Sequence, residues 1–207
     1  SSHENFLQHT LKPLSNVLSF EQIPQVQKLA WRDLNTHQAQ ANTVDGHLWL
    51  NPYNAIALAY AIAQKRGQQN PQYAKQYQQN AQFFEQQTLK QLQQIQEKFK
   101  GLSQRNYVAY HDAYQYLERP LGLKYQGSIS ISPEQKPSAK HLLHLKQQVT
   151  QQGWQCLLTE PQFDKGLADK VFGNHGRYIM IDETFNVATS YGEGFGQMTQ
   201  AVYDCVK

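Results

Sequence analysis

The amino-acid sequence predicts an α/β protein with two (β/α) lobes joined by one long backbone helix. After residue 103, short β-rich runs alternate with helical patterns, which is typical of a parallel sheet covered on both faces. Between Pro71 and Gly101, apolar residues recur every three or four positions and predict a single helix, roughly 43 Å long at 1.5 Å per residue. A helix of that length exceeds the diameter of a small domain, so we interpret it as the tie between two lobes.

The part before Pro71 offers about two strands, too few for a doubly wound sheet of its own. Apolar spacing predicts a helix over 4–14, and the polar stretch 35–46 has no periodicity and predicts a surface loop. The apolar run His47–Leu50 follows, with His47 expected beside the last strand of the first lobe. Asn54 then predicts a helix N-cap, with a glycine stop at Gly67.

The part after residue 103 contains a complete α/β lobe. We expect its strands at 106–111, 124–131, 155–160 and 177–182, and its helices at 113–121, 138–151, 164–172 and 194–206. The glycine cluster at 192–196 has no strand before it and is expected to form a turn. The predicted organisation is a remainder of the first metal-binding lobe at 1–70, the linking helix at 71–102 and the second lobe at 103–207.

Charge and motifs exclude several classes of function. The 19 basic and 16 acidic residues are scattered singly and give a net charge of +3, so no basic stripe is present to hold a phosphate backbone. The longest apolar stretch is far shorter than the roughly 20 residues needed to span a bilayer. The chain has no P-loop, GxGxxG, GxSxG or HExxH motif.

Four polar residues are expected at or beside the ends of strands, where ligands gather in parallel α/β sheets. His111, Glu160 and Asp182 each close a strand of the second lobe, and His47 belongs to the first lobe. Imidazole and carboxylate groups together are ligands for zinc or manganese rather than for phosphates. The sequence therefore predicts a candidate metal site.

The two cysteines, Cys156 and Cys205, leave two interpretations open. In a cytosolic protein they would be buried thiols, whereas in an exported protein they could close a disulfide. Composition alone does not decide between them.

Four motifs in order, DGHLWLNP, VAYHDAYQYLERPLGL, ISISPEQKPSAKHL and CLLTEPQF, resemble the zinc-uptake solute-binding proteins of bacterial ABC importers. The resemblance runs over nearly the whole chain. It implies two lobes joined by a long helix, a Zn²⁺ ion carried in the cleft between them, and delivery of that ion to an ABC permease in the inner membrane. It also implies a periplasmic protein that is not an enzyme, for which zinc is cargo rather than a catalytic cofactor.

Carried over motif by motif, the resemblance implies roles for individual residues. His47 and His111 would be histidine ligands from the two lobes, and Asp182 matches an acidic position near the metal. The manganese branch of the family has a carboxylate where His111 stands, so the added nitrogen favours zinc. Residues expected around the cleft are Glu160 and Asp112, and a disulfide is implied between Cys156 and Cys205.

The sequence departs from the family pattern near its start. The family supplies another histidine ligand before the segment that Ser1–Leu14 resembles, and the histidine-rich loop of the zinc branch is here represented only by His37. We therefore expect an N-terminally truncated chain with a depleted first lobe and an incompletely coordinated cleft. Alternative readings are a manganese- or iron-binding member of the family, a zinc-dependent periplasmic hydrolase with Glu160 as general base, and an adhesive surface protein whose histidines bind nothing.

Overall fold

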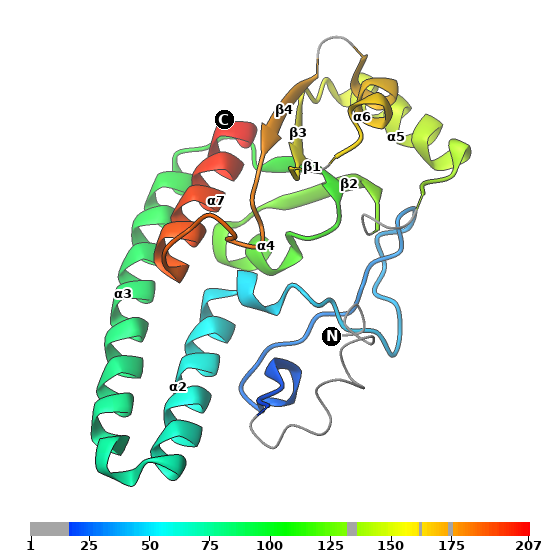
Figure 1. Cartoon of the computed structure of the whole chain (residues 1–207). Helices are drawn as coiled ribbons and strands as arrows, with labels where there is room; N and C mark the ends of the chain where they lie inside the picture. The colour runs from blue at the N-terminus through cyan, green and yellow to red at the C-terminus, as the bar shows by residue number, and fades with distance from the viewer. Residues whose placement is uncertain (1–16, 132–135, 162, 174–175) are drawn as a thin grey trace. The chain divides into compact units, whose positions relative to one another are not determined.

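The computed structural model describes residues 17–131, 136–161, 163–173 and 176–207. The helix expected over 4–14 lies outside these residues. The chain forms two compact units: unit 1 contains 17–31 and 41–94, and unit 2 contains 32–40 and 95–207. Figure 1 shows the elements of both units. The threefold division into 1–70, 71–102 and 103–207 stays a prediction.

Unit 2 is built on a four-stranded sheet in the order β2-β1-β3-β4, in which every neighbouring pair is parallel. Its strands are β1 (Asn106–His111), β2 (Lys124–Ser130), β3 (Cys156–Thr159) and β4 (Arg177–Met180). All four were expected from the sequence within two residues at each end. The predicted α/β class with a parallel sheet is confirmed.

Helices cover both faces of the sheet in unit 2 (Figure 1). The helices α5 (Ala139–Gln152) and α6 (Lys165–Phe172) bury one face, where Val108, Ile129 and Leu157 meet Leu145 and Val171. On the other face, α7 (Tyr191–Val206) contacts β1, β3 and β4, and α4 (Gln115–Leu121) contacts β2. Successive side chains of each strand point to opposite faces of the sheet, so helices pack against side chains on both faces.

Unit 1 is mainly helical in its described residues. It contains α2 (Pro52–Gln69), most of α3 (Ala74–Lys100) and the short 3₁₀ turns η2 (Phe20–Gln22), η3 (Leu48–Leu50) and η4 (Pro71–Tyr73). The long helix predicted over 71–101 is confirmed, although its first turn is the 3₁₀ turn η4. None of the helices in the described ranges is long and apolar enough to cross a membrane.

Several local expectations were wrong. His47 was expected beside a strand of the first lobe, but it precedes the 3₁₀ turn η3, and residues 17–31 and 41–94 contain no strand. The cap of α2 is Asn51, whose side chain accepts the backbone N–H of Tyr53, whereas Asn54 is buried and donates to the carbonyl of Leu48. The helix then runs through Gly67 to Gln69.

The turn expected for the glycine cluster at 192–196 was also wrong, because these residues form the first turns of α7. Ser190 caps that helix by accepting the backbone N–H of Glu193. A Cβ at Gly194 would lie 2.4 Å from Cγ of Phe185, so the glycine is required where this ring packs on the helix.

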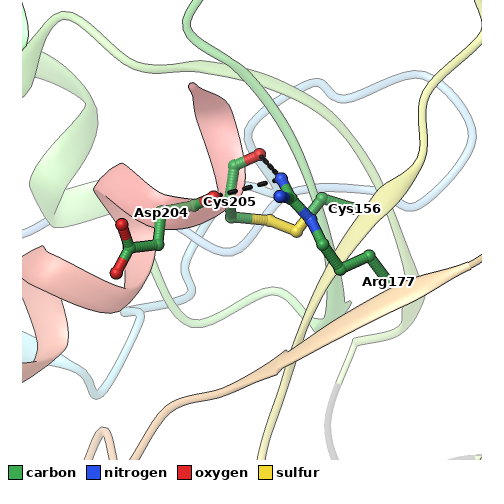
Figure 2. The surroundings of a disulfide bond; sticks show 4 residues. All are labelled: Cys156, Arg177, Asp204 and Cys205. Atoms are coloured by element: carbon green, nitrogen blue, oxygen red, sulfur yellow. Dashed lines mark hydrogen bonds between the residues drawn. A yellow bond between two sulfur atoms is a disulfide. The ribbon is translucent and has the colours of Figure 1, made fainter.

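A disulfide joins Cys156 at the start of β3 to Cys205 in the last turn of α7 (Figure 2). The pairing implied by the family resemblance is confirmed. The guanidinium of Arg177 donates to the backbone carbonyls of Asp204 and Cys205, each at 3.1 Å. The disulfide and Arg177 therefore both fasten the end of α7 to the sheet.

Removing this disulfide should destabilise unit 2. The bond closes a loop with a sequence separation of 49 residues, and the chain-entropy model assigns about 4 kcal/mol to a loop of that size. We expect the double substitution Cys156→Ala and Cys205→Ala to lower the free energy of unfolding of unit 2 by up to that amount, measured by chemical denaturation. Two alkylatable thiols in the unreduced wild-type protein would contradict the bond itself.

Candidate metal centre

The candidate ligand His111 lies at the carboxyl end of β1, beside Glu160, which directly follows the neighbouring strand β3. The parallel register pairs Val108 with Leu157 and Ala109 with Leu158, and the same register carried forward sets His111 opposite Glu160. Their side chains are 3% and 2% exposed, and Nδ1 of His111 lies 2.8 Å from Oε1 of Glu160.

Glu160 is held in turn by Tyr114, a residue that the sequence did not single out. The phenol of Tyr114 donates to Oε1 of Glu160 at 3.2 Å and is fully buried. Burial alone would lower the pKa of His111, but its contact with Glu160 and the charges of Glu183 and Asp112 raise that pKa above the ordinary value. These carboxylates therefore stabilise positive charge at His111.

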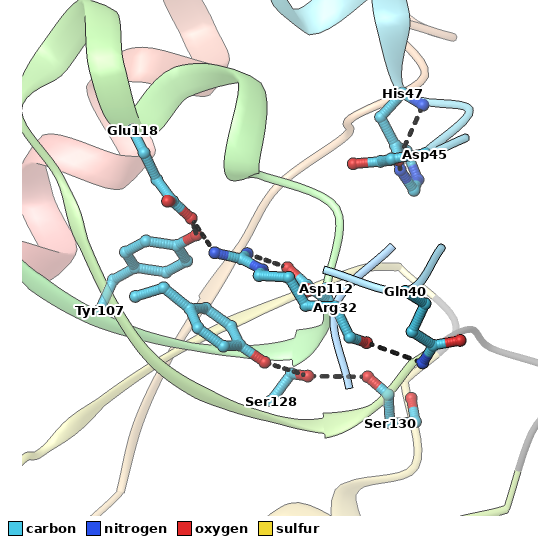
Figure 3. A network of polar contacts seen from close by, with 10 residues as sticks. Arg32, Gln40, Asp45, His47, Tyr107, Asp112, Glu118, Ser128 and Ser130 are labelled. Carbon is cyan, nitrogen blue, oxygen red and sulfur yellow. Dashed lines mark hydrogen bonds and ion pairs between the residues drawn. The ribbon is translucent and has the colours of Figure 1, made fainter. Parts of the chain in front are cut away.

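In unit 1, the candidate ligand His47 also lies against a carboxylate. Nδ1 of His47 is 2.6 Å from Oδ1 of Asp45, which also accepts the backbone N–H of His47 at 3.0 Å (Figure 3). The Asp45 side chain is 2% exposed and the His47 side chain 15%. Sequence reasoning missed Asp45. An aspartate side chain commonly accepts the backbone N–H of the residue two positions later and so forms a local turn.

The two histidines share one chemical arrangement. A carboxylate facing Nδ1 favours the tautomer that carries its proton on that nitrogen, so that Nε2 keeps the lone pair that binds a metal. The same carboxylate fixes the orientation of the ring and makes it a better donor to the metal. Both His47 and His111 therefore have the partner that metal-ligating histidines ordinarily have.

Asp112, expected near the cleft, is engaged by Arg32 (Figure 3). Nε of Arg32 donates to one oxygen of Asp112 at 2.8 Å, and a terminal guanidinium nitrogen pairs with the other. Another terminal nitrogen of Arg32 lies 2.5 Å from Oε1 of Glu118, and the guanidinium stacks 3.8 Å from the ring centroid of Tyr125. Asp112 thus holds a neighbouring segment in place rather than presenting both its oxygens to a metal.

That segment is 32–40, which belongs to unit 2 although the residues on either side of it belong to unit 1. His37 packs its ring edge against Tyr125, and the side chain of Asn35 lies 3.3 Å from Nδ1 of His141. The sequence predicts a surface loop over 35–46, and residues 32–40 form a loop with one isolated bridge between Arg32 and Ala39. No sequence pattern indicated that Arg32 would fasten this loop.

Asp182, the predicted acidic ligand, lies just beyond β4 and is partly exposed. Its two oxygens accept the hydroxyl of Thr184 at 2.7 Å and the backbone N–H of Val187 at 3.1 Å. Burial alone would raise the pKa of Asp182, but these hydrogen bonds outweigh that effect and lower it. The next residue, Glu183, is 8% exposed.

No three histidine, cysteine, aspartate or glutamate side chains are grouped as a metal site within the residues that the structure describes. In unit 2, the structure brings together His111 and Glu160. The charges of Glu183 and Asp112 also act on His111. In unit 1, it brings together His47 and Asp45. The set His47, His111 and Asp182 stays a prediction.

A family model described as the periplasmic component A of a zinc-uptake complex matches residues 3–205. This match covers almost the whole chain. The chain belongs to this zinc-uptake family.

Curated relatives agree with this family. The chain is 34% identical over 139 residues to the high-affinity zinc uptake system protein ZnuA of Brucella abortus (strain 2308), a match that covers 67% of this chain and 42% of that protein. It is 31% identical over 127 residues to ZnuA of Haemophilus ducreyi, covering 61% of this chain and 41% of that protein. The matched region thus spans about two fifths of the length of these relatives.

Solved structures share the fold of this zinc-uptake family member. A structure titled as ZnuA superimposes with a TM-score of 0.80 at 19% identity, covering 99% of this chain and 76% of that chain. A zinc-bound variant of AdcAII from Streptococcus pneumoniae gives 0.80 at 24% identity, covering 100% of this chain and 76% of that chain. A mutant of the laminin-binding adhesin of Streptococcus agalactiae gives 0.81 at 22% identity, covering 100% and 77%.

Arg32 should contribute strongly to the stability of unit 2. Its side chain is 11% exposed, and its loss would leave the carboxylate of Asp112, 5% exposed, without its counter-charge. Breaking one partner of a buried ion pair costs about 3–5 kcal/mol. We expect Arg32→Ala to lower the protection of β1 and β2 amides in hydrogen exchange by an amount of this order.

A matched control is Arg66→Ala, which removes an exposed side chain that donates to Gln69 at 3.2 Å. Exposed substitutions of this kind change stability by about 0.5 kcal/mol or less. Equal protection in both variants would contradict the role of Arg32.

Proposed function

We propose that the protein captures Zn²⁺ in the periplasm and delivers it to an ABC-type permease in the inner membrane. In this proposal His47 and His111 are the histidine ligands. Membership in the zinc-uptake family supports the class of function. The observation that carries the proposal is the carboxylate at Nδ1 of each histidine, at 2.6 Å for His47 and 2.8 Å for His111.

The chemistry required is reversible capture rather than catalysis. Zinc binds tightly to neutral imidazole nitrogens, and a carboxylate that contacts the other ring nitrogen raises the basicity of the ligating ring. Two such rings supply the borderline-soft nitrogen donors that favour zinc over manganese, which prefers oxygen. The carboxylates of Asp45 and Glu160 orient the rings and are not ligands in this proposal.

The position of Glu160 also argues against a zinc hydrolase. A general base must reach the water bound to the metal, on the side of the ligating atom. Glu160 instead contacts Nδ1 of His111 and accepts the hydroxyl of Tyr114. It is therefore placed to orient His111, on the ring nitrogen opposite the one that would bind zinc.

The test is zinc titration of the full-length protein by calorimetry, in competition with a chelator of known affinity. We expect His111→Ala to weaken zinc binding at least about 100-fold, because it removes one of the donors that a zinc site needs. Glu160→Gln should weaken it less, by about 10–100-fold, as is usual for a residue that orients a ligand.

The matched control is His144→Ala, which removes an exposed histidine on α5 in the same unit. This variant should bind zinc as the wild type does. If His111→Ala bound zinc as tightly as His144→Ala, the proposed ligand set would be wrong.

A further inference from the structure

One arginine, Arg32, holds both ends of the turn that follows the candidate ligand His111. Its Nε donates at 2.8 Å to one carboxylate oxygen of Asp112, the residue directly after His111, and a terminal nitrogen contacts the other oxygen (Figure 3). Its second terminal nitrogen lies 2.5 Å from Oε1 of Glu118, which belongs to α4. The guanidinium therefore links the beginning of this turn to the helix that follows it.

The turn between β1 and α4 has weak support from its own residues. Tyr114 occupies the N-cap of α4, but its hydroxyl donates to Glu160 instead of capping the helix. The helix has seven residues and contains Pro120, which removes a backbone hydrogen bond. Short helices depend on tertiary contacts rather than on their own propensity. The place of the turn is thus set by contacts such as those of Arg32.

The groups that orient His111 lie in this turn or are held by it. The buried hydroxyl of Tyr114 donates to Oε1 of Glu160 at 3.2 Å. The same oxygen of Glu160 lies 2.8 Å from Nδ1 of His111. A displacement of the turn would therefore move the end of β1 at His111, and it would also move the phenol that holds the carboxylate of Glu160.

The segment 32–40 that carries Arg32 is folded by its own hydrogen bonds. The side chain of Asp33 accepts the backbone N–H groups of Asn35 at 2.9 Å and of Thr36 at 2.8 Å. The backbone N–H of Asp33 donates to the carbonyl of Gln38 at 2.9 Å. These bonds close the segment on itself beside Arg32.

The same segment is docked on unit 2 at places other than Asp112. The guanidinium lies 3.8 Å from the ring centroid of Tyr125 on β2, and the ring of His37 packs edge-on against Tyr125 with 4.9 Å between the centroids. The side chain of Asn35 lies 3.3 Å from Nδ1 of His141 on α5. The guanidinium therefore reaches Asp112 from an anchored position.

We propose that Arg32 is a positioning residue for zinc capture, which holds the turn after β1 so that His111 keeps the orientation that binds zinc. This inference rests on the proposed function. Arg32 does not contact the metal and acts through Asp112 and Glu118. A ligand that is ordered before the metal arrives loses less conformational freedom on binding, so the affinity for zinc depends on this contact.

The test is the zinc affinity of Arg32→Ala in the full-length protein, measured by competition with a chelator. We expect binding to weaken about tenfold or more, the effect usual for the loss of a group that orients a metal ligand. The matched control is Arg105→Ala. Arg105 directly precedes β1 and donates at 3.3 Å to the carbonyl of Leu121, at the other end of α4. This variant should bind zinc within about twofold of the wild type, because exposed or half-buried groups away from the site have small effects.

A conservative variant, Arg32→Lys, keeps the positive charge at this position. A single ammonium cannot reproduce the planar fork that contacts both oxygens of Asp112 together with Glu118. We expect a loss of zinc affinity smaller than that of Arg32→Ala but larger than that of Arg105→Ala. This variant keeps the test decisive if Arg32→Ala does not fold.

A second readout separates positioning from stability. In the folded, metal-free variants, the ¹⁵N chemical shifts of the His111 ring report the surroundings of its two nitrogens. Arg32→Ala and Arg32→Lys should change these shifts, whereas Arg105→Ala should leave them as in the wild type. A purely structural role of Arg32 would lower stability without moving them.

The outcomes distinguish this inference from the proposed function. If His111→Ala loses zinc affinity while the folded Arg32 variants keep it, only this inference fails. Equal losses in the Arg32 variants and in Arg105→Ala would also overturn it. If His111→Ala itself binds zinc normally, the proposed function fails, and the role of Arg32 fails with it.

Discussion

The parallel pairing of β1 with β3 is the constraint on which the candidate site of unit 2 depends. Because the register sets Ala109 beside Leu158, the same register carried forward sets His111 opposite Glu160 at the carboxyl ends of the two strands. Burying an imidazole and a carboxylate at a strand end is unfavourable unless they interact. Their contact at 2.8 Å, with the hydroxyl of Tyr114 on the same carboxylate, meets that requirement.

Other contacts of unit 2 hold the sheet at both ends of its strands. The disulfide and Arg177 fasten the end of α7 to the starts of β3 and β4. At the carboxyl end of β1, Arg32 fastens the segment 32–40 through Asp112, the residue that follows His111. A site of this kind is organised before the metal arrives, which reduces the cost of ordering its ligands on binding.

Much of the fold followed from sequence patterns, because strand and helix periodicity report burial directly. The run NYVAYH was expected to be a strand and forms β1 with the same bounds. The turn at 47–50 was harder, since a run of four residues has too little periodicity to distinguish a strand from a 3₁₀ turn. The glycines of 192–196 suggested a turn because the packing of Phe185 on Gly194 is a tertiary contact without a local signal.

The candidate site, like the fold, could be predicted from the sequence only in part. Residue type and strand position pointed to His47, His111, Glu160 and Asp182, and the structure adds Asp45, Tyr114 and Arg32 as the groups that hold some of them. The partners of Asp182 could not be read from the sequence, because whether Asp182 or Glu183 faces inward depends on the register after β4. A shift of one residue exchanges which side chain is buried.

The central claim is that a carboxylate at Nδ1 prepares each histidine to bind zinc through Nε2. The most direct measurement is the tautomer of His47 and His111 in the metal-free full-length protein, from the ¹⁵N chemical shifts of the rings above pH 8. We expect a proton on Nδ1 and none on Nε2 in both rings, with the Nε2 chemical shift changing when zinc is added. A proton on Nε2, or zinc coordinated through Nδ1, would contradict it.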